Sequence, residues 1–390
     1  MYKVLIWDHT GESEKWCEGY LDKSEVEIIQ TITPAELVPA VLLQKDAWDW
    51  ILIFERGMRK AFNATIKNLK LPLEKIVYAY DPKSWAQRPK AIYTLLNGAR
   101  GGVTKIQRQF LVDNLKNLNT FMTCTVENIS YIATSVDSFR LPYMFTNKVN
   151  WASRDMKRFH ELAEQYYKVD DSAGYFLDLG ANIGTTGIYF IKNISPNLKL
   201  LAFEPDLENF KMHRVNVILN DLDETTTLVN CGLGNGASEL MLYRNGSNTG
   251  SIGFIKHEKS TPIAPIKIIA LDTYLAENKI PASEVKYVWL DTEGFEPQVL
   301  LGAKNLISEN PAPIFMECNL GAWDKSGLFE EMVNLLEAHY THFILFKGGN
   351  EAKNRDETIY PIETLRTHER PNNILGQLGD IFLIKRGLIA

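Results

Sequence analysis

The sequence predicts an α/β protein in which a small N-terminal α/β domain precedes a larger, mainly parallel sheet. Three observations support this prediction. Apolar strand-like runs alternate with helical patterns in both parts of the chain, as they do in parallel sheets. A glycine-rich turn within Phe176–Phe190 joins one such run to a helical pattern. The last two runs, His342–Lys347 and Asp380–Lys385, have no long helical pattern between them, so we expect them to pair antiparallel.

The composition is that of a globular protein of two or three domains, since the chain has 390 residues. Lys and Arg number 42 against 48 Asp and Glu, a net charge of −6, which gives no support for a nucleic-acid binder. The four cysteines lie far apart without zinc-ligand spacing, which is typical of reduced thiols. No signal-peptide pattern and no apolar run of about 18 residues is visible. We therefore expect a cytoplasmic protein without a membrane span.

Residues 1–118 are predicted to form the small α/β domain, which ends in a helical linker over Val103–Leu118. The turn after its first strand contains a single glycine, Gly11, which is too few for a phosphate cradle. We therefore expect this domain to serve recognition or assembly, for example of a homo-oligomer. Its strand candidates are Lys3–Trp7, Val26–Ile32, Trp50–Glu55 and Lys75–Tyr80.

Residues 119–390 are predicted to form the second domain. Short strands are expected between Thr120 and Tyr143, followed by a helix over Ala152–Tyr167. The segment Gly234–Thr273 alternates around a Gly/Ser/Asn centre, which indicates a hairpin or flap. The strands of the parallel sheet are expected at Tyr175–Gly180, Leu200–Pro205, Thr226–Cys231, Tyr287–Thr292 and Pro313–Cys318.

The glycine-rich turn carries the pattern D-x-G-x-N-x-G, formed by Asp178, Gly180, Asn182 and Gly184. Such a turn lets a ligand approach bare backbone, and the N–H groups of the following helix start face the ligand. A second acid, Glu204, ends the next strand, where it can accept hydrogen bonds from both ribose hydroxyls of an adenosine. These residues predict a nucleoside cofactor at the carboxyl ends of the parallel strands.

Two cofactors fit this arrangement. In a dinucleotide site the acid follows the glycines by about 20 residues, and Glu204 has a similar offset, so the acid does not discriminate. Asp178, two residues before the first glycine, does discriminate, because it would repel a pyrophosphate. The ammonium and sulfonium of S-adenosylmethionine would tolerate it. The turn therefore favours S-adenosylmethionine over a dinucleotide.

A cluster of acids lies at the end of the predicted strand Tyr287–Thr292 and just after it. Asp291, Glu293 and Glu296 lie within six residues, next to Gly294. Crowded carboxylates raise one another's pKa, which suits a general base for a hydroxyl group. The same acids could instead hold a divalent cation, or Glu296 could cap the next helix. We select the three acids as catalytic candidates and assign no metal ligand.

Other polar and aromatic residues are weaker candidates. Trp323 is either an apolar wall for a sugar ring or a packed loop aromatic. His213 is expected on the surface of a helix. A polyhydroxylated acceptor could be hydrogen-bonded by flap residues, unless these form a solvated loop: Asn245, Asn248, Thr249 and Ser251.

The motifs DLGANIG, FEP and LDTEGFEPQVLLGA together resemble the signature of the FkbM-type S-adenosylmethionine-dependent methyltransferases, over about Tyr175–Cys318. The resemblance implies a class I, Rossmann-like fold with a seven-stranded sheet and an antiparallel C-terminal strand. It also implies methyl transfer to a hydroxyl of a sugar or polyketide-like product, with Asp291 near the transferred methyl. It carries over as cofactor-site positions Asp178, Gly180, Asn182, Gly184 and Glu204.

The expected function is therefore S-adenosylmethionine-dependent O-methylation of a carbohydrate or a related natural product. Two alternatives stay open at this point. One is an NAD-dependent oxidoreductase, which would bind NAD and not the methyl donor. The other is a catalytically silent module that binds the cofactor without turnover.

Overall fold

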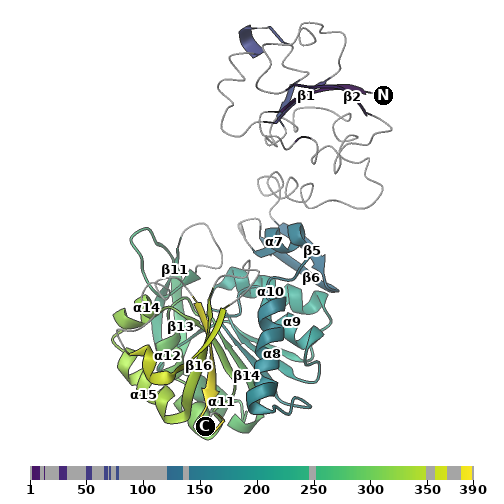
Figure 1. Cartoon of the computed structure of the whole chain (residues 1–390). Coiled ribbons are helices and arrows are strands. Elements are labelled where there is room, and N and C mark those ends of the chain that lie inside the picture. The colour runs from purple at the N-terminus through teal and green to yellow at the C-terminus, as the bar shows by residue number, and fades with distance from the viewer. Residues whose placement is uncertain are drawn as a thin grey trace. The chain divides into compact units, whose positions relative to one another are not determined.

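The computed structural model describes residues 2–8, 13, 26–32, 50–54, 66–68, 70–71, 76–78, 121–134, 140–245, 252–347, 356–366 and 379–388. The chain divides into two compact units, Met1–Asn119 and Thr120–Ala390 (Figure 1). The linker helix predicted at Val103–Leu118 lies outside the described residues. In these ranges no helix is both long enough and apolar enough to cross a membrane.

The N-terminal unit contains a four-stranded parallel sheet with the strand order β2-β1-β3-β4. Each strand falls in a segment where the sequence predicts one. Alternate apolar residues such as Leu5, Ile51 and Ile53 point to a common core, which Ile66 and Leu71 also join. The strands are β1 (Tyr2–Asp8), β2 (Val26–Ile32), β3 (Trp50–Phe54) and β4 (Ile76–Tyr78).

The second unit is built on an eight-stranded sheet with the order β17-β16-β18-β15-β14-β7-β8-β9. The five strands from β15 to β9 are parallel, and β18 lies antiparallel between β15 and β16. The strands are β7 (Tyr175–Leu179), β8 (Lys199–Phe203), β9 (Thr226–Val229), β14 (Val285–Leu290), β15 (Ile314–Cys318), β16 (Tyr340–Lys347), β17 (Asp356–Pro361) and β18 (Gly379–Lys385).

The antiparallel pairing of the last two predicted strands is confirmed, because β16 pairs antiparallel with β18. The prediction of seven strands is wrong, since β17 adds an eighth at the edge by pairing with β16. The sequence gives little sign of this strand. Its six residues DETIYP include only two large apolar ones, because an edge strand needs few buried side chains.

Helices cover both faces of the sheet. Figure 1 shows α8 and α9 on one side and α12, α14 and α15 on the other. The helices of this domain are α8 (Ser153–Tyr167), α9 (Thr185–Asn193), α10 (Leu207–Leu219), α11 (Leu271–Glu277), α12 (Glu296–Leu301), α13 (Lys304–Glu309), α14 (Leu320–Lys325) and α15 (Phe329–His339).

The two faces of the sheet have different cores. On the α8 side, Phe159 lies at the centre of an aromatic cluster, with ring centroids of Tyr287 and Phe315 at 5.5 and 5.6 Å. The other face is mainly aliphatic and includes Leu177 and Val288. Successive strand residues point to opposite faces, so Phe176 and Leu177 join different cores. Burial on both faces explains why the central strands read as continuous apolar runs.

The predicted flap forms a second, smaller sheet with the order β10-β13-β11-β12, in which β11 pairs antiparallel with β13 and β12. Its strands are β10 (Gly232–Leu233), β11 (Ser238–Arg244), β12 (Ile252–Gly253) and β13 (Thr261–Ile269). Asn245 accepts a hydrogen bond from Ser260. The other three flap candidates, Asn248, Thr249 and Ser251, lie outside the described residues.

A hairpin and a helix precede the large sheet: β5 (Phe121–Val126), β6 (Ile129–Thr134) and α7 (Arg140–Asn147). The two strands of the hairpin lie where the sequence predicts short strands, between Thr120 and Tyr143. In β5 and β6 every second side chain is buried, so one face of this ribbon packs against the domain. The segment from β5 to α7 is called the lead-in below.

Asn216 of α10 and Asn220, which caps that helix, bind the edge of β6 as a neighbouring strand would. The Asn216 side chain accepts from Ile132 N at 2.7 Å and donates to Ile132 O at 3.1 Å. Asn220, one turn further, does the same with Ser130 at 3.0 and 2.8 Å. The amide of Asn216 also donates to Ile183 O in the glycine turn at 2.8 Å. Asn216 therefore joins the lead-in to that turn.

We predict that Asn216→Ala lowers the free energy of unfolding by about 2–4 kcal/mol, because it leaves several buried backbone groups without partners. Urea denaturation measures this change. Asn278→Ala is the matched control, since Asn278 is exposed and its side chain donates to Tyr274 O of the preceding turn. A loss no larger for Asn216 than for the control would contradict the linking role.

Candidate functional site

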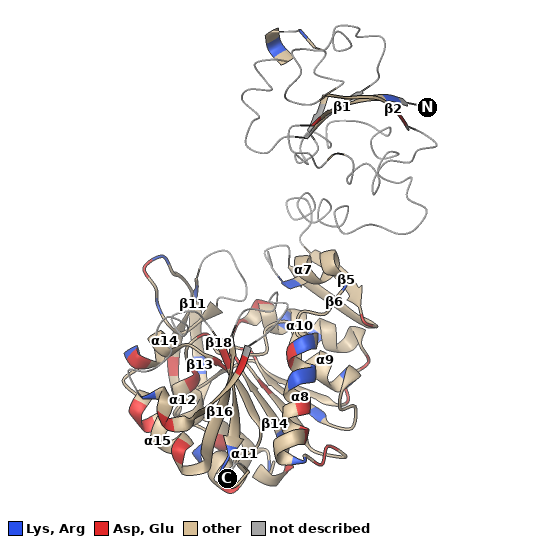
Figure 2. Ribbon diagram, in the orientation of Figure 1, with Lys and Arg blue, Asp and Glu red and all other residues tan. Residues whose placement is uncertain are grey.

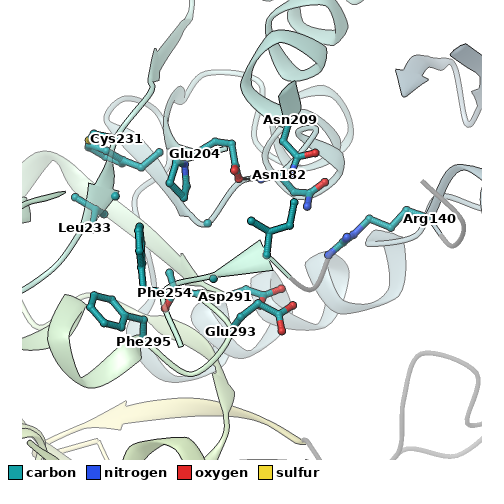
Figure 3. Close-up of a pocket in the computed structure, with 17 residues that line it drawn as sticks. Arg140, Asn182, Glu204, Asn209, Cys231, Leu233, Phe254, Asp291, Glu293 and Phe295 are labelled. Carbon is teal, nitrogen blue, oxygen red and sulfur yellow. Dashed lines mark hydrogen bonds between the residues drawn. The ribbon is translucent and has the colours of Figure 1, made fainter. Parts of the chain in front are cut away.

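A pocket opens at the carboxyl ends of β8, β7 and β14 (Figure 3). The chain runs from β7 outward to β8 and β9, then returns to β14 on the other side of β7, so this is a topological switch point, where α/β sheets bind ligands. The empty space in and at the mouth of the pocket is about 570 Å³, which includes open solvent. The sequence predicted a site at this edge, and five of its eight candidates line the pocket: Gly180, Asn182, Glu204, Asp291 and Glu293.

Gly180 brings two strand ends into close contact. Its φ is +95°, and a Cβ at this position would lie 1.9 Å from the Asp291 carbonyl oxygen. Any side chain would therefore push β7 and β14 apart. The N–H of Gly180 donates to Phe203 O at 3.1 Å, which ties the turn to β8 as well. The glycine is required here for both space and backbone conformation.

Gly184 begins α9 with a φ of +87°, and a Cβ there would lie 2.3 Å from the ring of His213. His213 is fully buried, so its predicted surface position is wrong. Its helix α10 is covered on two sides, since Asn216 of the same helix bonds both the turn and β6. Burial lowers the pKa of His213 to about 3, so the ring is neutral. In the described part of the chain neither ring nitrogen has a hydrogen-bond partner.

Asp178 lies beneath the turn and does not line the pocket. It is fully buried, and its Oδ2 accepts hydrogen bonds from Thr186 Oγ1 at 2.7 Å and Gly187 N at 2.9 Å. These bonds satisfy the first turn of α9. Burial raises the pKa of Asp178 to about 7 despite them. Contact of Asp178 with a ligand stays a prediction.

Glu204 is held in place by two backbone N–H groups. Its Oε2 accepts from Asn182 N and its Oε1 from Asp206 N, both at 2.7 Å. Asn182 can present its N–H because it adopts a left-handed conformation, with φ at +51°. Figure 3 shows Glu204 and Asn182 facing each other at the top of the pocket. Burial raises the pKa of Glu204 to about 8.

Asp291 and Glu293 occupy the opposite side of the pocket. The N–H of Asp291 donates to Leu179 O at 3.0 Å and so continues the pairing of β14 with β7. Glu293 has a φ of +55°, which turns the chain sharply after the strand. Burial, and then the charge of Asp291, raise the pKa of Glu293 to about 8. Burial also raises the pKa of Asp291.

Glu296 does not line the pocket. It is fully buried, and its Oε1 accepts from the N and Oγ1 of Thr292, both at 2.9 Å, and from Gly294 N at 3.2 Å. Its Oε2 accepts from Trp323 Nε1 at 2.7 Å. Glu296 is therefore arranged to hold the turn that carries Asp291 and Glu293. The role of Trp323 as an apolar wall is wrong, because its ring is fully buried and binds Glu296.

Two further acids near the site were missed by the sequence reasoning. Glu317 of β15 and Asp380 of β18 lie opposite each other in the antiparallel register, where the start of β18 is red in Figure 2. Burial, followed by the charges of Asp291 and other acids, raises the pKa of Glu317 to about 11. Glu317 reaches this edge through the parallel pairing of β15 with β14, and the antiparallel pairing of β18 with β15 brings Asp380 beside it. Within the described ranges, no group of three or more His, Cys, Asp or Glu residues is arranged to hold a metal ion.

Arg140, at the start of α7, was missed as well. Among the described residues that line the pocket it is the only Lys or Arg. Figure 3 shows its side chain reaching from the lead-in toward the acids. Burial raises the pKa of Asp291 and Glu293, and the charge of Arg140 opposes that rise. No motif surrounds Arg140 in the sequence, and only the folded lead-in brings it to the pocket.

The remaining wall of the pocket is apolar. Phe254 and Phe295 lie with their ring centroids 5.2 Å apart, and Leu233 and Cys231 adjoin them. Figure 3 shows these four on the side away from Arg140. The pocket thus has one face suited to a flat apolar group and another suited to charged and hydroxyl groups.

Residues 178–342 match the family model described as the methyltransferase FkbM domain. Among solved structures, the chain is similar to methyltransferase FkbM from Methylobacillus flagellatus KT, with 14% identity, a TM-score of 0.34, and 92% of this chain and 90% of that chain covered. It is also similar to precorrin-6y C5,15-methyltransferase from Geobacter metallireducens GS-15, with 13% identity, a TM-score of 0.31, and 58% and 87% covered.

A third similar structure is the SAM-dependent O-methyltransferase from Thermotoga maritima, with 13% identity, a TM-score of 0.29, and 59% of this chain and 64% of that chain covered. No curated protein matches the chain.

The raised pKa values predict that the protein is less stable at alkaline pH. Glu204 and Glu293 ionise with a pKa of about 8 in the folded state against an ordinary 4.5. Between these values the folded protein keeps protons that the unfolded chain has released, so stability is greatest below the unfolded pKa and falls as pH rises toward 8. The urea midpoint should therefore be lower at about pH 8 than at about pH 5.

Two variants isolate this effect. Glu293→Gln removes one of the titrating groups and should make the pH dependence shallower. Glu309→Gln changes an exposed residue of α13 outside the pocket and should leave the pH dependence of the urea midpoint as in the wild type. A midpoint that rises with pH in this range would contradict the buried, proton-holding state of these acids.

Proposed function

We propose, because residues 178–342 match the model of the methyltransferase FkbM domain, that the chain transfers a methyl group from S-adenosylmethionine to a hydroxyl of a carbohydrate or a related natural product. The observation that carries this proposal is the pocket itself. It combines a glycine turn and a backbone-held acid, Glu204, with a second pair of acids, Asp291 and Glu293, at one switch point.

The donor set fits S-adenosylmethionine. Glu204 is fixed by two N–H groups and keeps lone pairs that can accept the ribose hydroxyls. The apolar wall with Phe254 and Leu233 suits the adenine ring. Asp291 and Glu293 suit the ammonium and sulfonium, because opposite charges attract in a partly buried site. A pyrophosphate would meet these same carboxylates and be repelled, so the pocket does not favour NAD.

The chain's own residues have two tasks in this reaction. When bound, the cofactor supplies an electrophilic methyl group. The pocket must hold the acceptor oxygen in line with it, since alignment accounts for much of the acceleration. A carboxylate must also take the hydroxyl proton. Asp291 is our first choice for that base and Glu293 the second, whereas Glu296 positions the turn that carries both.

We predict micromolar binding of S-adenosylmethionine and S-adenosylhomocysteine and no binding of NAD, measured by calorimetric titration of the full chain. A screen with methyl-labelled cofactor and sugar acceptors then identifies the substrate. Binding of NAD alone would contradict the cofactor assignment. Cofactor binding without transfer to any acceptor would favour the catalytically silent module.

We predict that Asp291→Asn still binds S-adenosylmethionine, more weakly because one carboxylate partner of its cations is lost, and lowers the turnover number at saturating cofactor by about 10²- to 10⁴-fold, the usual contribution of a general base. Glu293→Gln should have a smaller effect, and Glu309→Gln should have none. If Glu293→Gln loses more activity than Asp291→Asn, the assignment of the base is reversed. Parallel binding titrations separate loss of chemistry from loss of the cofactor.

A further inference from the structure

Provided that S-adenosylmethionine is the cofactor proposed above, we infer that Arg140 binds the carboxylate of its methionine part. Arg140 would then determine cofactor specificity from a position outside residues 178–342, the segment that matches the family. The juxtaposition that suggests this is that Arg140 faces several acids across the pocket.

The first step is the balance of charge in the pocket. The described lining residues include three acids, Glu204, Asp291 and Glu293, and one base, Arg140. The methionine part of the cofactor carries an ammonium, a sulfonium and a carboxylate. The two cations find partners among the acids. The carboxylate would be repelled by them, and burying an anion without a partner is costly.

The second step is the chemistry of the side chain. A guanidinium offers planar pairs of N–H donors that match the two oxygens of a carboxylate. Figure 3 shows the Arg140 side chain directed into the space between Asn182 of the glycine turn and Glu293 of the opposite turn. A cofactor whose ribose lies at Glu204 and whose methyl group lies near Asp291 would place its methionine part in this region.

The third step is the support of Arg140. Helix α7 buries Leu141 and Met144, which fixes the helix that carries the arginine. Just after α7, Asn150 donates a hydrogen bond to the hydroxyl of Tyr131 in β6 at 2.7 Å. The same hydroxyl lies 3.5 Å from Thr185 O at the start of α9. The arginine and the glycine turn thus share one support, which presets the distance between them.

An anionic acceptor is the competing ligand for Arg140. The position of the arginine favours the cofactor, because its charge also acts on Asp178 and Glu204, on the side of the glycine turn. An arginine devoted to the acceptor would be expected to face only Asp291 and Glu293. The experiment therefore has to distinguish the two ligands.

The test compares S-adenosylmethionine with its decarboxylated form, which lacks only the carboxylate, by calorimetric titration of the full chain. The wild type should bind the first about 10- to 100-fold more tightly, the range for a hydrogen-bonded charge pair. Arg140→Met should remove this difference by weakening the binding of S-adenosylmethionine alone. Arg140→Lys keeps the positive charge but not the paired N–H donors, so it should keep only part of the difference in affinity between the two nucleosides. Lys148→Met, an exposed change just after α7, is the control.

Each outcome is decisive. Equal affinities of the wild type for both nucleosides would overturn the inference without any variant, even if Arg140→Met does not fold. An equal loss of both nucleosides in Arg140→Met would make Arg140 a support of the pocket's shape. If Arg140→Met binds both nucleosides as the wild type does and changes only the KM for the acceptor in turnover assays, Arg140 binds an anionic acceptor instead. If the wild type binds neither nucleoside, the proposed cofactor itself fails.

Discussion

The contact between the backbones of Gly180 and Asp291 is the constraint on which both sides of the pocket depend. A Cβ on Gly180 would lie 1.9 Å from the Asp291 carbonyl oxygen, so β7 and β14 can end side by side only with a glycine there. This contact places the glycine turn directly beside the turn with Asp291 and Glu293. A wider separation would divide one pocket into two shallow surfaces, neither able to hold two reactants in line.

The second constraint is electrostatic. Acids are expensive to bury, yet Glu204, Asp291 and Glu293 line one pocket, and Glu317 lies nearby. Burial raises the pKa of Glu204 and Glu293 to about 8, so these groups hold protons near neutral pH. A ligand that carries positive charge would restore their ionised form and release those protons. These acids therefore favour a ligand that carries positive charge. Even without a ligand, the charge of Arg140 opposes the rise in the pKa of Glu204 and Glu293.

Local patterns were enough to predict the strands other than the edge strand β17, the glycine turn and the acids at the ends of β7, β8 and β14, because these depend on neighbours in the sequence. The other errors concern partners that are distant in the sequence. His213 is buried because α10 lies between the glycine turn and β6. Trp323 binds Glu296, which is 27 residues away, so neither side chain faces the pocket. Arg140 reaches the pocket only through the folded lead-in, and no local pattern marks it.

The lead-in is therefore more than a connection between the two units. Asn216 binds Ile132 of the lead-in and Ile183 of the glycine turn with one side chain, so a shift of either segment breaks bonds to the other. Residues 178–342 supply the glycine turn and the acids, and the lead-in supplies Arg140, the one basic residue among the described residues that line the pocket. A substitution of Arg140 in the lead-in can therefore change the charge of the pocket while the glycine turn and the acids stay in place.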